Sequence, residues 1–360
     1  MRLFQNSGLY PAYRRLFDRH HDKAADFKTR LNAFLHDRYN VSHILLPVLQ
    51  DSSEAFFTNG DDEILQYAWA KEHGLPENAS MDDILRAQIE NHRTEIFYNL
   101  DPMRYGSSFL KRLPGCVKKS ICWRAAPSPG ADFSSYDIVV CNFPSIIDSW
   151  VKLGWTAAYL TPAHDPVMDA YAKNTERTID ILFIGGYGRH HIQRSSVLES
   201  VARLSSEYTI SYCTDRSRMT RLADSPLGLL PVLSRYRRPR NIRDVSEPPV
   251  FGLALYQQLS QAKIVLNGAI DMAGQDRGNM RCFESLGCGA LLLSDRGKYP
   301  MGFDNRDTIM LYNNANDAAV QASSILQDWS THCEIAKNGH AMVKHQYSKS
   351  VQWNMFQALL

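Results

Sequence analysis

Residues 276–295 read Asp276-Arg277-Gly278-Asn279-Met280-Arg281-Cys282-Phe283-Glu284-Ser285-Leu286-Gly287-Cys288-Gly289-Ala290-Leu291-Leu292-Leu293-Ser294-Asp295. The pattern predicts a polar loop, a short helix from about Asn279 to Leu286, a Gly-Cys-Gly turn and a buried strand from Ala290 to Leu293. Polar side chains therefore gather where the loop opens the helix.

This helix start has the features of an anion site with a carboxylate beside it. Asp276, Asn279, Arg281 and Glu284 fall in or near its first turns, where unpaired backbone N–H groups and the helix dipole favour negative charge. Glu284 could accept hydrogen bonds from the vicinal hydroxyls of a ribose or sugar, and Arg281 could bind a phosphate or hold Glu284. The residues alone equally allow a plain alternative, in which Asn279 is an N-cap and Arg281 and Glu284 form a solvated i,i+3 pair.

Bulk composition indicates an ordinary globular protein of more than one domain. The 360 residues suffice for two cores, and 44% are hydrophobic and 22% charged. A net charge of +2 gives no reason to expect a nucleic-acid partner. We expect a cytoplasmic protein, since no signal peptide or spanning helix is evident. Seven cysteines without a C-x-x-C pair suggest reduced thiols, and no metal-ligand spacing is present.

The N-terminal half begins with helical and turn signals and continues as short apolar strands. Helical periodicity covers Ala12 to Arg38, and Ser42 to Val48 is strand-like. The compact apolar runs that follow are typical of parallel strands covered on both faces, which predicts an α/β domain. These runs are 95–100, 120–123, 137–141 and 157–160.

A second strand–turn–helix unit follows a polar boundary near residue 174. The strand 178–184 leads into Gly185, Gly186 and Gly188 and then a helix, an order that lets backbone approach a diphosphate. Without the full G-x-G-x-x-G pattern the signal taken singly is weak, because tight turns between strand and helix use glycine with no ligand at all. Farther on, the dense basic run 235–243 could contact an anionic acceptor, a lipid headgroup or nucleic acid, but its composition favours a solvated loop or disordered flap.

The sequence resembles a family at the stretch quoted first. Asn279 to Glu284, followed by Gly287, Gly289 and Ala290 and then Ser294-Asp295, is similar to the donor-site signature of glycosyltransferases with the GT-B architecture. The resemblance is strongest to a bacterial branch that includes spore-coat and surface-polysaccharide transferases. It covers about 179–347 well and the N-terminal half loosely. The branch often carries a histidine where this chain has Gly268-Ala269.

The resemblance implies an α/β fold of two Rossmann-like domains facing across a cleft, with a C-terminal helix that crosses back. The implied domains are 1–174 on the acceptor side, 175–345 for the nucleotide-sugar, and 346–360 as the crossing helix. It implies catalytic roles for Arg189, Arg281 and Glu284, of which the arginines neutralise the leaving diphosphate. Donor-binding positions would be Gly8, Gly185, Gly186, Gly188, Arg194, Asn267, Asp276 and Asn279.

The expected reaction moves a sugar from a nucleotide-diphospho-sugar to a glycan or glycolipid acceptor in cell-surface polysaccharide synthesis. No cofactor or metal is expected, and the protein could contact the inner face of a membrane peripherally. Retaining relatives often carry two acidic residues eight apart, and Asp276 and Glu284 have that spacing. A nucleotide-sugar epimerase on the same fold, or a non-catalytic nucleotide-sugar-binding or scaffold protein, remain alternatives.

Overall fold

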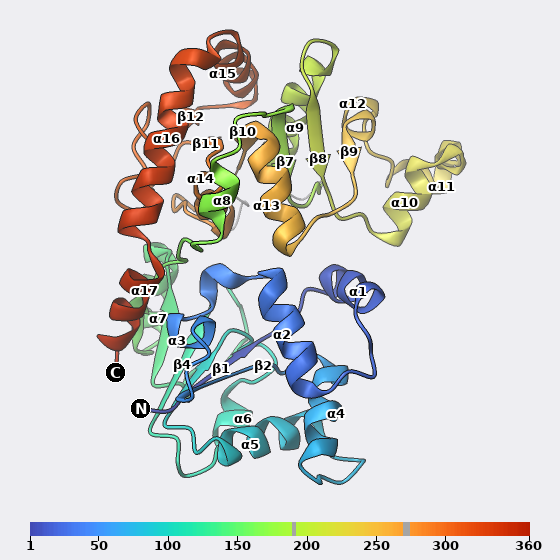
Figure 1. Cartoon of the computed structure of the whole chain (residues 1–360). Coiled ribbons are helices and arrows are strands. Elements are labelled where there is room, and N and C mark those ends of the chain that lie inside the picture. The colour runs from blue at the N-terminus through green and yellow to red at the C-terminus, as the bar shows by residue number, and fades with distance from the viewer. Residues whose placement is uncertain (189–191, 269–273) are drawn as a thin grey trace. The chain divides into compact units, whose positions relative to one another are not determined.

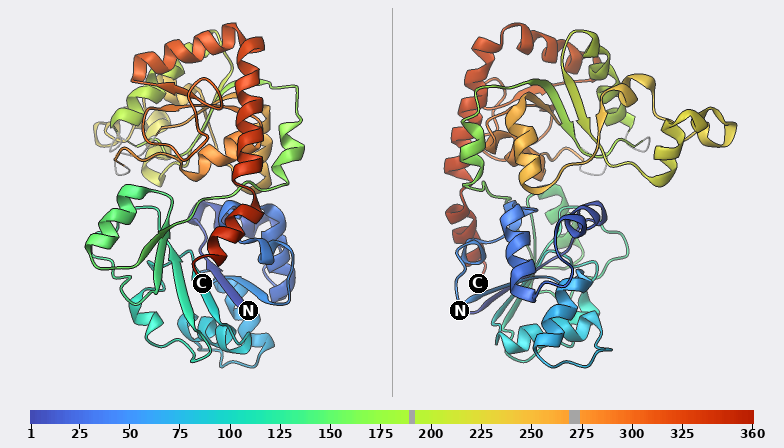
Figure 2. Two further views of the ribbon diagram at one scale, coloured as in Figure 1. Left: turned by 90° about the vertical axis from the view of Figure 1, so that its left-hand side faces the viewer. Right: turned by 45° about the vertical axis from the view of Figure 1, so that its right-hand side comes forward.

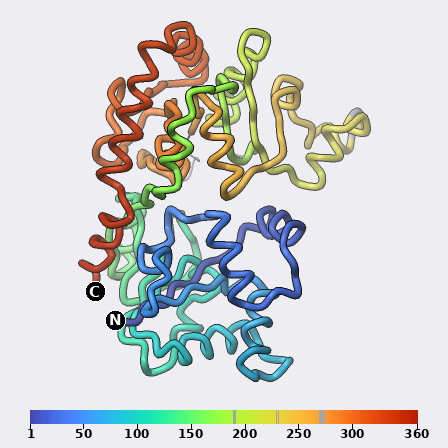
Figure 3. The backbone as a smooth tube through the Cα atoms, viewed as in Figure 1, coloured from blue at the N-terminus to red at the C-terminus, as the bar shows by residue number. Residues whose placement is uncertain are grey.

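The chain forms two compact units, each with its own sheet (Figure 1). The structure, a computed structural model, describes residues 1–188, 192–268 and 274–360. Unit 1 comprises Met1–Ala163 and Lys349–Leu360, and unit 2 comprises His164–Ser348. Both chain termini therefore belong to unit 1 (Figure 3).

The boundaries between the units differ from those expected after residues 174 and 345. The segment after Ala163 already belongs to unit 2, because the His164 N–H donates to the Tyr347 carbonyl over 2.7 Å. The short helix α8 (Met168–Ala172) then packs on helices α13 (Gly252–Gln261) and α14 (Met280–Gly287). The polar residues near 174 therefore lie within unit 2.

Unit 1 is a six-stranded parallel sheet in the order β2-β1-β3-β4-β5-β6. Alternate residues of a strand enter opposite cores: Phe97 packs with Trp150 of α7 on one face, whereas Ile96 and Tyr98 pack with Phe356 of α17 on the other. The strands are β1 (Leu3–Ser7), β2 (Ala55–Asn59), β3 (Ile96–Asn99), β4 (Lys119–Trp123), β5 (Ile138–Cys141) and β6 (Ala157–Tyr159). The helices are α1 (Pro11–His20), α2 (Phe27–Asp37), η1 (Val41–His43), α3 (Leu46–Leu49), α4 (Glu63–Glu72), α5 (Met81–Asn91), α6 (Ser107–Leu110), α7 (Pro144–Lys152) and α17 (Lys349–Gln357).

Two N-terminal predictions were wrong. The strand expected over 42–48 is the end of η1 followed by α3, because Pro47 occupies the first turn of that helix and cannot donate to a sheet. The single helix expected over 12–38 is two helices, and the second begins at the Asp26 cap, whose carboxylate accepts from the Thr29 N–H.

Unit 2 is a second six-stranded parallel sheet, in the order β12-β11-β10-β7-β8-β9 (Figure 1). One face packs on α9 and α15, and the other on α14 and α16. The strands are β7 (Ile179–Ile184), β8 (Ile210–Cys213), β9 (Ser246–Glu247), β10 (Ala262–Leu266), β11 (Leu291–Asp295) and β12 (Met310–Tyr312). The remaining helices are α9 (Ile192–Ala202), η2 (Arg203–Ser206), α10 (Arg218–Asp224), η3 (Pro226–Leu229), α11 (Pro231–Ser234), α12 (Arg240–Asp244), α15 (Ala315–Gln327) and α16 (Trp329–Gln346).

His43 of unit 1 makes stability depend on pH. The centroid of its ring lies 4.3 Å from that of the Trp123 ring. Burial, assisted by the charge of Lys349, lowers the pKa of His43 from 6.5 to about 3. Between these values the unfolded chain binds a proton that the folded chain does not, so stability falls as pH falls from 6.5 towards 3. We expect His43→Phe to lower the slope of unfolding free energy against pH by up to ~1.4 kcal/mol per pH unit there. Denaturant titrations at pH 5 and 7 measure it, and an unchanged slope would contradict the assignment.

Candidate functional site

The carboxyl edge of the unit 2 sheet contains a topological switch point. From β7 the chain winds outward through β8 to β9 and then returns to β10 on the other side of β7. Connections on the two sides of this point leave in opposite directions, and open α/β sheets bind ligands in the resulting crevice. The loop after β10 meets the first turn of α9, the helix that follows β7, at this point: a Cβ on Gly268 would lie 3.6 Å from Cγ of Arg194.

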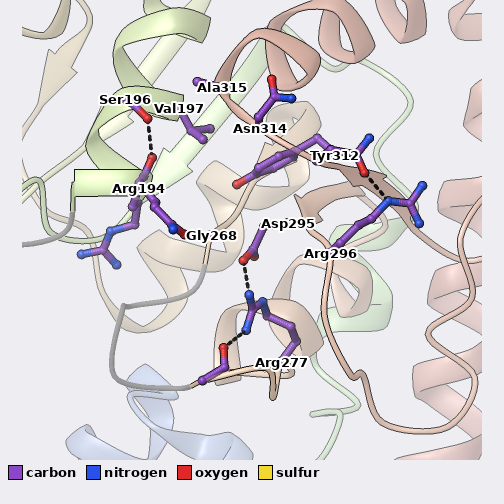
Figure 4. A pocket seen from close by; sticks show the side chains of 13 residues that line it. Arg194, Ser196, Val197, Gly268, Arg277, Asp295, Arg296, Tyr312, Asn314 and Ala315 are labelled. Atoms are coloured by element: carbon purple, nitrogen blue, oxygen red, sulfur yellow. Dashed lines mark hydrogen bonds and ion pairs between the residues drawn. The ribbon is translucent and has the colours of Figure 1, made fainter.

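A pocket of about 460 Å³ lies over this edge (Figure 4). Its walls come from the first turns of α9 and α15, the loops after β10 and β11, and the end of β12. The lining residues are Gln193, Arg194, Ser196, Val197, Gly268, Gly274, Arg277, Asp295, Arg296, Tyr312, Asn313, Asn314 and Ala315. Three arginines against one aspartate make the pocket suited to an anion of the size of a nucleotide.

Arg277 is held rigidly at the pocket. Its Nη1 donates to the carbonyls of Gly274 and Asp276 over 2.9 and 3.0 Å, and Nη2 pairs with Asp295 over 2.7 Å. Its side chain is only 10% exposed. Its Nε is buried without a partner in the described part of the chain. The guanidinium is thus pre-positioned, which reduces the entropy lost when an anion binds.

The start of α14 differs from an ordinary capped helix. Asn279 has the backbone conformation of an N-cap, yet its side chain makes no cap hydrogen bond. Its Nδ2 instead donates to Oδ1 of Asn267 over 3.2 Å. Asn279 is therefore the N-cap residue by position, as the plain alternative expected, but no side-chain oxygen of Asn279 covers the first-turn N–H groups.

Asn267 has a structural role in the described fold. Its Nδ2 donates to Ser294 Oγ over 3.0 Å and approaches Cys282 Sγ at 3.4 Å, and its backbone carbonyl accepts from the Tyr312 hydroxyl over 2.8 Å. These bonds tie the end of β10 to α14, β11 and β12. The amide expected to contact the donor is thus engaged within the protein, so its donor role stays a prediction.

Arg281 and Glu284 form the i,i+3 pair of the plain alternative, but the pair is buried instead of solvated. Nη1 of Arg281 lies 2.6 Å from Oε2 of Glu284, and their side chains are 19% and 4% exposed. Burial raises the pKa of Glu284, and the charge of Arg281 opposes that shift.

The other predicted donor residues are placed as follows. Asp276 is buried, and its backbone pairs with Lys298 in the loop after β11. The Gly185 N–H extends the β7 ladder to the Cys213 carbonyl, and the Gly188 carbonyl accepts from Ser195 Oγ. Gly185, Gly186 and Gly188 all have φ outside the left-handed region, so this turn does not require glycine for its backbone angles.

Arg189 lies outside the described residues, so Arg194 is the only predicted site residue that lines the pocket. Gly8 follows β1 in unit 1, and a Cβ there would lie 3.0 Å from Oδ2 of Asp101. The described residues contain no group of three His, Cys, Asp or Glu side chains placed for a metal ion. No helix among them is both long and apolar enough to span a bilayer.

Sequence reasoning missed Arg277, Asp295, Arg296 and Tyr312 as pocket residues. A usable signal was their position, because Asp295 and Tyr312 are the last residues of β11 and β12, and Arg296 follows at once. Strand ends gather at one edge of a parallel sheet whatever their separation along the chain.

Comparisons with known proteins agree with this architecture. Residues 219–356 match the family described as glycosyl transferase-like. Solved structures that resemble the whole chain include HepE of Anabaena, crystallised with UDP and glucose (9% identity, TM-score 0.60, 100% of this chain and 99% of that one). A glycosyltransferase of Rickettsia africae (9%, 0.60, 100% and 97%) and sucrose-phosphate synthase of Thermosynechococcus elongatus (13%, 0.55, 100% and 98%) are also similar. No curated protein sequence matches the chain.

The two parallel sheets and the likeness of the whole chain to these structures define the fold as that of GT-B glycosyltransferases. The match of residues 219–356 to the glycosyl transferase-like family lies within unit 2 and the terminal helix α17. The finer prediction of a spore-coat branch stays a prediction.

Proposed function

We propose that this enzyme transfers a sugar from a nucleotide-diphospho-sugar to a glycan or glycolipid acceptor, in cell-surface polysaccharide synthesis at the cytoplasmic side of the membrane. The observation that carries the donor class is the pocket with Arg194, Arg277 and Arg296 at the β7–β10 switch point. HepE, which shares the fold, has been crystallised with UDP-glucose. The family match favours transfer over the epimerase and non-catalytic alternatives.

In the proposed reaction the bond between the sugar C1 and the diphosphate oxygen breaks while a bond from C1 to an acceptor hydroxyl oxygen forms. The hydroxyl proton passes to solvent, and negative charge grows on the leaving diphosphate. Fixed cations and backbone N–H groups stabilise such charge most when they need no rearrangement. Arg277, already held by two carbonyls and Asp295, meets that condition. We propose that neither a cofactor nor a metal takes part, so activity should survive a chelator.

Arg277→Ala should lower the affinity for UDP, or for whichever nucleoside diphosphate binds best, at least tenfold. Loss of one charge-assisted hydrogen bond typically costs about 1.5–3 kcal/mol, which corresponds to this factor or more. The measurement is calorimetric titration of the folded variant with a panel of nucleoside diphosphates, with and without Mg²⁺.

Arg203→Ala is the matched control, because Arg203 is an exposed arginine of η2 in the same unit and outside the pocket. Its affinity should equal that of the parent. Equal affinities of the parent and the folded Arg277→Ala variant would show that the nucleotide binds elsewhere.

A further inference from the structure

The connection from β8 to β9 forms an arm, residues 215–244, that is not used by the donor pocket. It extends beyond the β9 edge of the unit 2 sheet (Figure 2). The outer part contains α10, η3 and α11, which pack on one another, and α12 at the base packs on α9. The arm therefore presents a separate surface of unit 2.

The arm has a defined fold. Arg238 donates from its backbone N–H and from Nε to Asp224 over 3.1 and 2.8 Å, and from Nη1 to Thr214 Oγ1 over 3.0 Å. Both charged side chains are less than 8% exposed. Asp224 is the last residue of α10, Arg238 lies near the end of the arm, and Thr214 directly precedes its start. The bonds of Arg238 therefore connect these three segments and hold the outer helices in place. The basic run at 235–243 is thus part of a folded element.

The outer helices expose apolar side chains instead of burying them. Met219, Leu222, Leu227, Leu230 and Val232 are 39–73% exposed. These five lie within fourteen residues, yet they are almost a third of the sixteen large apolar side chains exposed in the described part of the chain. Single exposed apolar residues are ordinary, but such a concentration marks an interaction surface.

Positive charge accompanies these apolar side chains. The arm holds eight arginines and three aspartates, a net charge of +5, whereas the whole chain carries only +2. Arg218 and Arg221 are exposed on α10 beside Met219 and Leu222, and within the described residues neither forms an ion pair. Asp224 is already paired with Arg238 at the base of the arm. The outer surface is therefore apolar and cationic at once.

We propose that the arm docks this enzyme on an anionic membrane surface. Apolar side chains of an interfacial element enter the boundary between headgroups and acyl chains, while arginines pair with lipid phosphates. A nucleic acid would match the arginines but leave the leucines and valine in water, and an apolar protein groove would leave Arg218 and Arg221 without partners. The proposal concerns location and goes beyond the transfer reaction, since no nucleotide-binding residue is involved.

Sedimentation with lipid vesicles tests the proposal on the full chain. We expect binding to vesicles of phosphatidylcholine and phosphatidylglycerol in equal amounts, little binding to phosphatidylcholine alone, and weaker binding at high salt. Arg218→Glu with Arg221→Glu should lower the vesicle partition coefficient at least tenfold, and Leu230→Asp with Val232→Asp by a similar factor. Because all four side chains are exposed, the melting midpoint should stay near that of the parent.

Two matched controls separate the arm from general effects of charge and polarity. Arg15→Glu with Arg19→Glu makes the same charge change on α1, and Met301→Asp with Val320→Asp makes the same polar change at other exposed sites of unit 2. Both controls should bind vesicles as the parent does. Lack of parental binding to anionic vesicles, equal losses in arm and control variants, or a parental dimer in solution that the arm variants convert to monomer would each overturn the proposal. Nucleotide affinity, measured alongside, reports separately on the donor site.

Discussion

Glu284→Gln is expected to weaken nucleotide-sugar binding about 100-fold while leaving the protein folded. The proposed role of this carboxylate is to accept hydrogen bonds from the vicinal hydroxyls of the donor ribose. Oε2 already accepts from Arg281, and within the described residues Oε1 accepts no hydrogen bond. Glutamine keeps one acceptor oxygen but has no charge and donates from the other position, so one charge-assisted bond is lost and the second is weakened. The sum is roughly 3 kcal/mol, or about two powers of ten in affinity. Calorimetric titration with the donor nucleotide measures the change.

Glu334→Gln provides the control for this substitution. Glu334 also forms an i,i+3 ion pair, with Lys337 on α16, but both of its members are largely exposed. The same chemical change should therefore leave nucleotide affinity and stability unchanged. Glu284→Ala is a poorer probe, because it leaves the guanidinium of Arg281 half-enclosed and unpaired and so destabilises the fold as well. If folded Glu284→Gln bound the nucleotide with parental affinity, Glu284 would have no part in donor binding.

The sequence predicted the C-terminal part of the fold because there each element follows its local pattern. The helix expected from Asn279 to Leu286 is α14 at Met280–Gly287, and the strand after it is β11. The helix ends before the strand because of the glycine turn, as expected. Gly289 has a φ of +74°, which favours glycine, and a Cβ there would lie 2.9 Å from Nη2 of Arg177.

The N-terminal strand β1 was not predicted, because polar residues interrupt its apolar pattern. β1 pairs with both β2 and β3 inside the sheet of unit 1, yet its residues include Gln5 and Asn6, which are fully buried. Their amides are satisfied by hydrogen bonds to the backbone at 43 and 45 and to Asn99. Burial of polar groups with partners in tertiary contact cannot be read from apolar periodicity.

The pocket was only partly predictable for a related reason. The strand that leads to Asp295 was expected, but the order of the strands in the sheet was not, so the meeting of Arg194 with Asp295 and Tyr312 could not be inferred. Asn267 and Asn279 present the reverse case, and their donor roles stay predictions. Each has the polar chemistry of a donor contact, but they hydrogen-bond to one another.

Arg177→Met should destabilise the protein by about 3 kcal/mol and loosen the supports of α13 and α14. The guanidinium of Arg177 donates from Nη1 to the carbonyls of Leu259, Ser260 and Ala262, and from Nη2 to that of Cys288. These acceptors lie at or just beyond the carboxyl ends of the two helices, where carbonyls lack helical partners and the dipole is negative. Methionine fills the space but leaves the partly buried carbonyls without a donor, and hydrogen bonds to charged groups are worth about 1.5–3 kcal/mol each. Denaturant titration measures the loss.

The effect should extend to the donor site, because α14 carries the Arg281–Glu284 pair and its carboxyl end is one of the two that Arg177 holds. Lys173→Met is the control, since Lys173 is an exposed cation four residues before Arg177. Both residues line a second pocket, which is separate from the donor pocket. Loss of a surface charge there should change the unfolding free energy by less than about 0.5 kcal/mol. An Arg177→Met variant as stable as Lys173→Met would mean that water satisfies these carbonyls as well as Arg177 does. A variant that loses stability but keeps full nucleotide affinity would show that Arg177 stabilises the helix ends only. The Arg281–Glu284 pair on α14 would then keep its place without the Arg177 hydrogen bonds.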